Sequence, residues 1–425
     1  MDIHLNSRSP VNNKQHAGTD RPRQDSENGA PGPQNPWRAR IAILLGAHAV
    51  GTMHSVSVLA LAPVMRPDLG LNFTEFGLLM TAYSTGQISG SIPAGAFVDR
   101  VGVGWALVGA SVILSIGAAL LTQAEGLTLA LIALIIIGWG YSITNPATAR
   151  GVLEWFPPNR RATAIGLKQT GVPVGGVLAA GTLALTVFLS WQTIYWLIAA
   201  ATLCNAAICS SLAERPRTYG GGKAGPLKGV LRLARDRNFG VLVVSNGLFN
   251  IGQYNFFTYL TSFMSEAAQA SQEIASLTLG LAQAASAVGR IGLGALSDVV
   301  FKSRRKGLTV LVCLAASAFF AAMAVVGSVW SAVAGIGIAM LLGLTIASYA
   351  SLMQTMAVES VAPEHAGSSI GYISIGAASG AMIGPPLFGA MIDATGRFSD
   401  GWLMTGAIVA GGVALFAYGF REKTR

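Results

Sequence analysis

The sequence predicts an all-α integral membrane protein with twelve transmembrane helices in two pseudo-symmetric six-helix bundles. Hydrophobic residues make up 52% and charged residues 11% of the 425 residues, whereas a soluble domain carries about 25% charged residues. A membrane span needs roughly 20 apolar residues, and its backbone must satisfy its own hydrogen bonds in lipid, so it is helical. The twelve apolar segments lie near residues 39–61, 74–97, 105–122, 128–152, 162–189, 190–212, 239–264, 273–297, 307–327, 330–358, 367–391 and 399–420.

The polar segments divide the chain into five regions. Residues 1–38 are rich in Pro, Asn, Arg and Gly and lack the apolar stretch of a signal peptide, which predicts a disordered cytoplasmic tail. The long polar stretch 213–238 predicts a cytoplasmic linker between the two bundles. The bundles are then residues 39–212 and 239–420, and residues 421–425 form a second cytoplasmic tail.

Two repeated sequence features indicate that the two bundles arose by duplication of one half. Asp99 ends the second span four residues after a glycine, and Asp298 ends the eighth span in the same way. Glu154 recurs as Glu359 at an offset of 205 residues. Repeats of this kind place a binding site at their interface, near the membrane midplane.

The net charge of +9 follows the membrane topology and does not indicate a nucleic-acid partner. Of the 28 Lys and Arg residues, 23 lie in the tails and in the loops of one side, whereas Arg66 and Arg397 lie on the other. This bias places both termini in the cytoplasm. We therefore expect a multi-pass, monomeric protein in the lipid bilayer of the bacterial inner membrane.

The sequence gives no indication of an enzyme, a cofactor or a metal site. Cys204, Cys209 and Cys313 all fall within spans, so neither a disulfide framework nor a thiol metal site is expected. No nucleophile–base pairing, metal-ligand spacing or phosphate-binding loop occurs in any span or loop.

Several motifs resemble those of the major facilitator superfamily. They are Gly95…Asp99-Arg100…Gly102 after the second span, its copy after the eighth, and Trp155-Phe-Pro-Pro…Arg160-Arg161 after the fourth. Within the superfamily the chain is most similar to bacterial organic-anion and cyanate-type permeases, on the residues Gly166-Leu-Lys168-Gln169-Thr-Gly171-Val-Pro173 and Gly289-Arg290-Ile-Gly. The resemblance implies alternating-access transport and covers about residues 39–420.

The chain departs from the superfamily pattern at two places. Val103 and Gly104 stand where the superfamily loop after the second span usually carries two basic residues. We therefore expect fewer charged contacts in the first half. The Gly-Pro-x-x-Gly-Gly sequence of drug–proton antiporters is not met, because Gly175 and Gly176 follow Pro173 one residue too early. This second departure argues against drug efflux.

Three charged residues lie inside spans, where each costs several kcal/mol and is a functional candidate. Arg290 and Lys168 lie about 12 Å and 10 Å from the same membrane edge, one in each half. Two cations that face one cavity require an anion, and Arg grips a carboxylate with two bonds. We therefore expect Arg290, Lys168 and the adjacent Gln169 to bind substrate. Lys168 corresponds to Ile373 in the repeat, so the scaffold does not require a lysine there.

The third membrane charge, Arg150, lies one helical turn before Glu154 and suggests a gate. In the superfamily, such residues at cytoplasmic helix ends clamp the two halves together. The predicted gating residues are Asp99, Arg100, Arg150, Glu154, Asp298 and Glu359.

No Asp or Glu lies in the middle of a span, where proton-coupled carriers usually hold one. His48 and His54 are the remaining candidates that titrate near neutral pH, and we take His54 as the candidate proton relay. Their spacing places them about 120° apart on a helix, so they do not form one paired site.

Uncharged polar side chains at helical spacing are expected to complete the cavity, although such groups also hold helices together in lipid. These stripes include Tyr141 and the predicted substrate-binding residues Tyr83, Gln87, Asn145, Asn250, Tyr254 and Gln283.

The sequence thus predicts a secondary active transporter of a small organic anion, most simply a carboxylate. One alternative is a proton-coupled exporter of drugs or metabolites. Another is a transporter-like membrane sensor that binds its ligand without translocating it.

Overall fold

The computed structural model describes residues 37–156, 161–213, 235–301, 304–329, 332–361 and 366–422. The chain divides into two compact units, residues 1–36 and 37–425, and all described residues belong to the second. Nearly all of the predicted tail 1–38, most of the linker 213–238 and the end of the tail 421–425 therefore lie outside the described residues.

The described helices follow the twelve predicted segments. The first half contains α1 (Trp37–Ala60), α3 (Phe73–Val101), α4 (Val103–Leu121), α5 (Leu127–Trp155), the pair α6 (Arg161–Gln169) and α7 (Gly171–Ala184), and α8 (Trp191–Ser210). The second half contains α10 (Arg237–Ser262), α11 (Gln272–Val299), α12 (Arg305–Val329), the pair α13 (Ala332–Leu344) and α14 (Ala350–Glu359), α15 (Ala366–Thr395) and α16 (Phe398–Gly419). The short α2 (Ala62–Asp68), η2 (Leu185–Val187) and η3 (Phe263–Ala267) lie in connections.

Length and composition make these helices suitable for a membrane. Nine of the described helical stretches are long and apolar enough to cross a bilayer, and α3, α10 and the α13–α14 pair bring the passages to twelve. The predicted fold class, all-α with twelve transmembrane helices, is confirmed.

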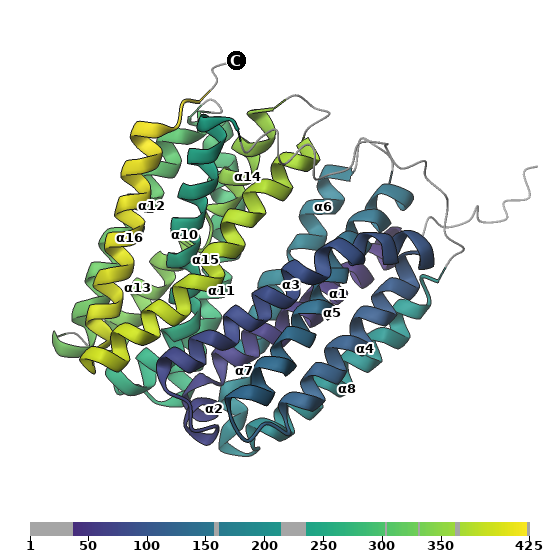
Figure 1. The fold of residues 1–425 in the computed structure, drawn as a ribbon, viewed down its shortest axis with the longest axis horizontal. Coiled ribbons are helices and arrows are strands. Elements are labelled where there is room, and N and C mark those ends of the chain that lie inside the picture. The colour runs from purple at the N-terminus through teal and green to yellow at the C-terminus, as the bar shows by residue number, and fades with distance from the viewer. Residues whose placement is uncertain are drawn as a thin grey trace, which may run out of the picture. The chain divides into compact units, whose positions relative to one another are not determined.

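The pseudo-symmetry is visible in the packing of the helices. In the first half α3 packs on α5, α4 on α8 and α1 on α7, and in the second half α11 packs on α13, α12 on α16 and α10 on α15. Each pair in the second half occupies the same places in helix order as its counterpart in the first. The two halves meet through α3 against α15 and α7 against α11 (Figure 1).

Two passages are broken into two helices each. Thr170 separates α6 from α7, and Pro173 lies in the first turn of α7, where proline is tolerated. Residues 345–349 form turns between α13 and α14. By contrast, Pro93, Pro146 and Pro385 lie inside the continuous helices α3, α5 and α15.

Glycine allows α3 and α15 to approach closely at the end of the bundle where α2 lies. A Cβ on Gly77 would lie 2.5 Å from the backbone carbon of Pro385, and a Cβ on Gly389 would lie 2.3 Å from the carbonyl oxygen of Phe73. Side chains at these two positions are therefore incompatible with the observed contact between the halves.

We predict that Gly77→Val prevents the halves from closing at this end, because its side chain collides with the α15 backbone. The measurement is cross-linking of Arg66→Cys to Glu266→Cys by a bifunctional thiol reagent, at positions whose native side chains form an ion pair of 3.0 Å, in a background without the three native cysteines. Gly181→Val is the matched control, because a Cβ there meets nothing within 4 Å. Cross-linking should fall in Gly77→Val alone, and equal cross-linking in both variants would contradict the packing argument.

Candidate functional site: a central polar cavity

A cavity of about 150 Å³ lies between the two halves. Helices α1, α3, α5 and α7 of the first half line it together with α10 and α11 of the second. Its lining residues are Thr52, Ser55, Val56, Leu59, Met80, Tyr83, Gln87, Tyr141, Val172, Gln253, Tyr254, Phe257 and Gln283. Eight of these side chains are neutral hydrogen-bonding groups, and no Asp, Glu, Lys or Arg is among these thirteen residues.

Four of the predicted substrate-binding residues line this cavity: Tyr83, Gln87, Tyr254 and Gln283. Gln87 donates a hydrogen bond to the Tyr83 hydroxyl at 3.2 Å, as the spacing of four residues suggests. The cavity therefore offers several amide and hydroxyl groups whose positions are fixed by their own helices.

Sequence reasoning missed the cavity residues Thr52 and Ser55 of α1, whereas Tyr141, which belongs to the expected polar stripes, lines the cavity together with Gln253. Thr52 and Ser55 lie three residues apart and so share a helix face, which is the signal that was used for other spans. The Thr52 and Tyr141 hydroxyls lie 3.3 Å apart and link α1 to α5.

Arg290 on α11 has no acidic partner among the described residues. Its one described hydrogen bond runs from Nε to Ser286 Oγ at 3.4 Å. The guanidinium interacts electrostatically with Tyr141, Tyr254 and Tyr349, two of which line the cavity. A cation thus lies beside the cavity, and the described residues use only part of its hydrogen-bonding capacity.

Lys168 lies near the end of α6, and its side chain is buried with a relative exposure of 2%. Its Nζ donates to Asn145 Oδ1 at 3.0 Å and to Thr148 Oγ1 at 3.1 Å, and it lies 3.3 Å from His48 Nε2. The structure thus joins two residues predicted for the site, Lys168 and Asn145, within the first half. The neighbouring Gln169 is exposed.

The ammonium of Lys168 therefore uses its donors on protein groups in this conformation. Shared anion binding by Lys168 and Arg290 stays a prediction.

The other predicted residues of the membrane interior have protein partners. Asn250 donates to the Tyr349 hydroxyl at 3.2 Å and is buried. His54 is buried against α8, with Nε2 2.8 Å from Thr202 Oγ1. His48 and His54 contact different helices, as their angular separation predicts. Neither histidine belongs to the lining residues of the cavity.

Each half builds a cluster of one arginine and two carboxylates at the end where α3 and α11 finish. In the first half Arg150 pairs with Asp99 and, at 2.6 Å, with Glu154. Both predicted acids thus contact the predicted arginine, whereas Arg100 is exposed.

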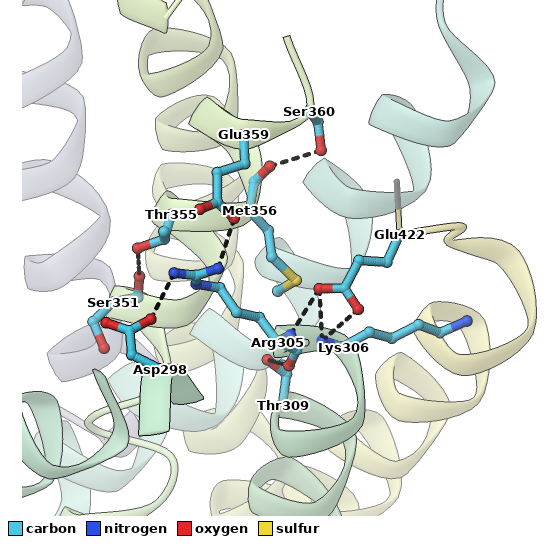
Figure 2. Close-up of polar contacts among 10 residues, drawn as sticks. All are labelled: Asp298, Arg305, Lys306, Thr309, Ser351, Thr355, Met356, Glu359, Ser360 and Glu422. Atoms are coloured by element: carbon cyan, nitrogen blue, oxygen red, sulfur yellow. Dashed lines mark hydrogen bonds and ion pairs between the residues drawn. The ribbon is translucent and has the colours of Figure 1, made fainter. Parts of the chain in front are cut away.

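In the second half Arg305 pairs with Asp298 at 2.9 Å and Glu359 at 2.8 Å (Figure 2). Sequence reasoning missed Arg305 because the arginine does not follow the repeat: the position equivalent to Arg150 is Thr355. Arg305 comes from the basic loop after the eighth span instead. Glu422 accepts its backbone N–H at 2.7 Å, which fixes the start of α12.

At the opposite end, contacts join the two halves directly. Arg66 pairs with Glu266 at 3.0 Å. Asp393 of α15 accepts hydrogen bonds from the backbone N–H groups of Phe73 and Thr74, at 3.0 and 2.8 Å, and so caps α3 of the other half. The halves are therefore closed at the Arg66–Glu266 end, whereas the described ion pairs of the Asp99 and Asp298 clusters lie within one half each.

This arrangement of helices, cavity and terminal clusters agrees with a family comparison. Residues 43–344 match the Major Facilitator Superfamily. The chain belongs to this superfamily of transporters.

A "Hexuronate transporter" of Bacillus subtilis (strain 168) is 27% identical over 375 residues, which cover 84% of this chain and 87% of that protein. A "Probable sulfoacetate transporter" of Cupriavidus necator is 22% identical and covers 88% of this chain and 91% of its own length. The expectations of a multi-pass membrane transporter and of a protein that is not an enzyme are thus confirmed.

Among solved structures, the fold is similar to a bacterial homologue of the human lysosomal transporter Spinster, crystallised in an inward-facing and occupied conformation. The TM-score is 0.76 at 17% sequence identity, and the match covers 92% of this chain and 98% of the other. A second structure of a bacterial Spinster homologue, inward-facing and unoccupied, matches with a TM-score of 0.73. These similarities support the fold.

We predict that Arg305→Gln lowers the free energy of unfolding by about 2 kcal/mol, because charged hydrogen bonds are lost and two carboxylates face each other. Unfolding in a denaturing detergent series measures this change, with the exposed Arg304→Gln as the control. Adding Thr355→Arg to Arg305→Gln should restore stability, since it places arginine four residues before Glu359, as Arg150 precedes Glu154. No rescue by Thr355→Arg would refute the equivalence of the two clusters.

Proposed function

We propose that this transporter moves a small organic anion, a carboxylate, across the bacterial inner membrane by alternating access. The observation that carries the proposal is Arg290, a guanidinium within a span that lies beside a polar cavity and lacks an acidic partner among the described residues. A charge at membrane depth is costly unless another group compensates it. A substrate carboxylate compensates it when it binds.

The neighbours of Arg290 suit the rest of such a substrate. The guanidinium can grip both oxygens of a carboxylate. The amides of Gln87, Gln253 and Gln283 and the hydroxyls of the cavity can bind hydroxyl groups of the substrate. A hydroxylated carboxylate therefore satisfies both the charge and the neutral polar groups.

The names of two relatives support the same class of substrate. Hexuronates carry a carboxylate on a polyhydroxylated chain, and sulfoacetate carries a carboxylate and a sulfonate. Both are anions, so an anion-binding arginine is in keeping with this group of relatives. We propose hexuronate-like acids as the first substrates to test.

The terminal clusters support alternating access. The contacts of Arg66 with Glu266 and of Asp393 with the start of α3 must break before a substrate reaches the cavity from that end. The Asp99 and Asp298 clusters then become candidates for closing the opposite end. The distribution of Lys and Arg supports a cytoplasmic Asp99–Asp298 end, and in that orientation the described conformation is closed to the outside.

The drug-exporter alternative receives less support, because the described membrane interior lacks a carboxylate that would hold a cationic drug or a proton. A sensor without transport is separated from a transporter by one observation. Solute flux in vesicles that contain only the purified protein occurs with a transporter and not with a sensor.

We predict that Arg290→Gln and Arg290→Lys both weaken carboxylate binding by roughly ten- to a hundredfold, the effect of about 1.5–3 kcal/mol for a charged hydrogen bond. Lysine should not substitute, since it cannot form the two-bond fork. Calorimetric titration of the purified variants with glucuronate, galacturonate and sulfoacetate measures the affinity.

The surface variant Arg397→Gln is the control, because its guanidinium pairs with Asp400 and is 70% exposed. It should bind each anion as the wild-type protein does. Wild-type affinity of Arg290→Lys for these anions would contradict the proposal that the Arg290 guanidinium binds both oxygens of the carboxylate.

A further inference from the structure

Lys168 and His48 form a pair of basic groups at the junction of α1, α5 and α6. Their nitrogen atoms lie 3.3 Å apart, and both side chains are buried. Thr148 Oγ1 lies 2.8 Å from His48 Nε2 and 3.1 Å from Lys168 Nζ, and Asn145 Oδ1 accepts from Lys168 at 3.0 Å. Each of these partners is neutral.

The helices packed against this pair add no carboxylate to it. On α1, His54 contacts α8 instead, and Arg38 and Arg40 lie in the first turn. On α5, Tyr141 meets His48 edge-on with ring centroids 6.4 Å apart, while Arg150 and Glu154 pair with each other. The segment Gly171–Ala184 of α7 has no titratable side chain, and Arg161 begins α6. Two positive charges 3.3 Å apart would repel each other strongly here, so the pair holds at most one.

The hydrogen bonds around the pair are compatible with two protonation states. In the first, Lys168 is an ammonium that donates to Asn145, Thr148 and His48 Nε2, and the imidazole proton is on Nδ1. In the second, Lys168 is a neutral amine with two donors, and His48 Nε2–H donates to Thr148 and to the amine lone pair. His48 Nδ1 is buried and has no hydrogen-bond partner among the described residues, so each state leaves the same atom unsatisfied by them.

We propose that Lys168 and His48 are the proton-binding site of this transporter, with the proton stored on Lys168 and exchanged through His48. This inference rests on the proposed transport of an anion. Release begins when Lys168 Nζ passes a proton to His48 Nε2. Nδ1 of His48 is buried in the described conformation, so its N–H bond breaks in the state of the transport cycle in which water reaches it, and water accepts that proton. One Nζ–H and one Nδ1–H bond are lost, one Nε2–H bond forms, and one proton leaves.

The position of the pair connects it to the cavity and to a break in the helix. Asn145 lies four residues after the cavity residue Tyr141 and therefore on the same face of α5. Lys168 lies two residues before the break at Thr170. A charge gained at Lys168 thus acts near the substrate and at the joint between α6 and α7. The proposal assigns the relay to His48 in place of His54, because His54 has no second basic group as a partner among the described residues.

The first test is an acid–base titration of the purified protein in detergent, which needs no substrate. Compared with Lys168→Met, the wild-type protein should bind one more proton between roughly pH 6 and pH 9, the range in which a proton carrier has to change its charge. His54→Gln is the matched control. His54 lies on the same helix as His48, is also buried, and also contacts a threonine, Thr202. This variant should retain the extra proton. Superimposable titrations of wild type and Lys168→Met would overturn the proposal.

The second test separates proton coupling from a structural role. Vesicles with wild type, Lys168→Met, His48→Gln or His54→Gln are assayed with labelled glucuronate, first by exchange at equal pH and then by accumulation under a pH gradient. His48→Gln should keep exchange and lose accumulation at least tenfold, Lys168→Met should lose accumulation, and His54→Gln should keep both exchange and accumulation. Loss of exchange together with accumulation in His48→Gln would overturn the proposal in favour of a structural histidine. Absence of exchange by the wild-type protein for every anion would instead contradict the proposed function, and the titration would still decide on the proton site.

Discussion

A positive charge within the membrane that has no negative partner among the described residues is the constraint on which the rest of this structure depends. Arg290 lies on a spanning helix, and a charge at that depth is costly unless other groups compensate it. Tyr141, Tyr254 and Tyr349 lie close enough to affect it electrostatically, and a cavity of neutral donors and acceptors lies beside it. We propose that the site is thereby suited to an anion, whose affinity arises from the charge that the described residues leave uncompensated.

The ends of the helices differ from the central site, because there the arginines pair with carboxylates. Arg150 and Arg305 each bind two acids within their own half, so each cluster stabilises one bundle without tying it to the other. At the Arg66–Glu266 end the contacts cross between the halves. Since these residues are near water, their contacts can be exchanged for hydration at modest free energy. Such exchange is what two rigid bundles require in order to rock about a central site.

Much of the fold was predictable from the sequence because a span must be long, apolar and helical, and these properties are local. Individual pairs such as Arg150 with Glu154 and Tyr83 with Gln87 were predictable for the same reason, since a spacing of four residues fixes them. What the sequence leaves open is the rotation of each helix about its axis, which packing decides. Depth placed Lys168 level with Arg290, but rotation turned its Nζ toward His48 and Asn145. Arg305 was missed because the repeat keeps the acids of its cluster and changes the source of the arginine.

A structure of the protein with a bound carboxylate substrate tests the central claim most directly. It should place both carboxylate oxygens within hydrogen-bonding distance of the Arg290 guanidinium and the remaining polar groups of the substrate against the cavity glutamines. A bound anion that leaves Arg290 without contact, or an Arg290 that pairs with an acidic side chain of the protein in that complex, would contradict the account.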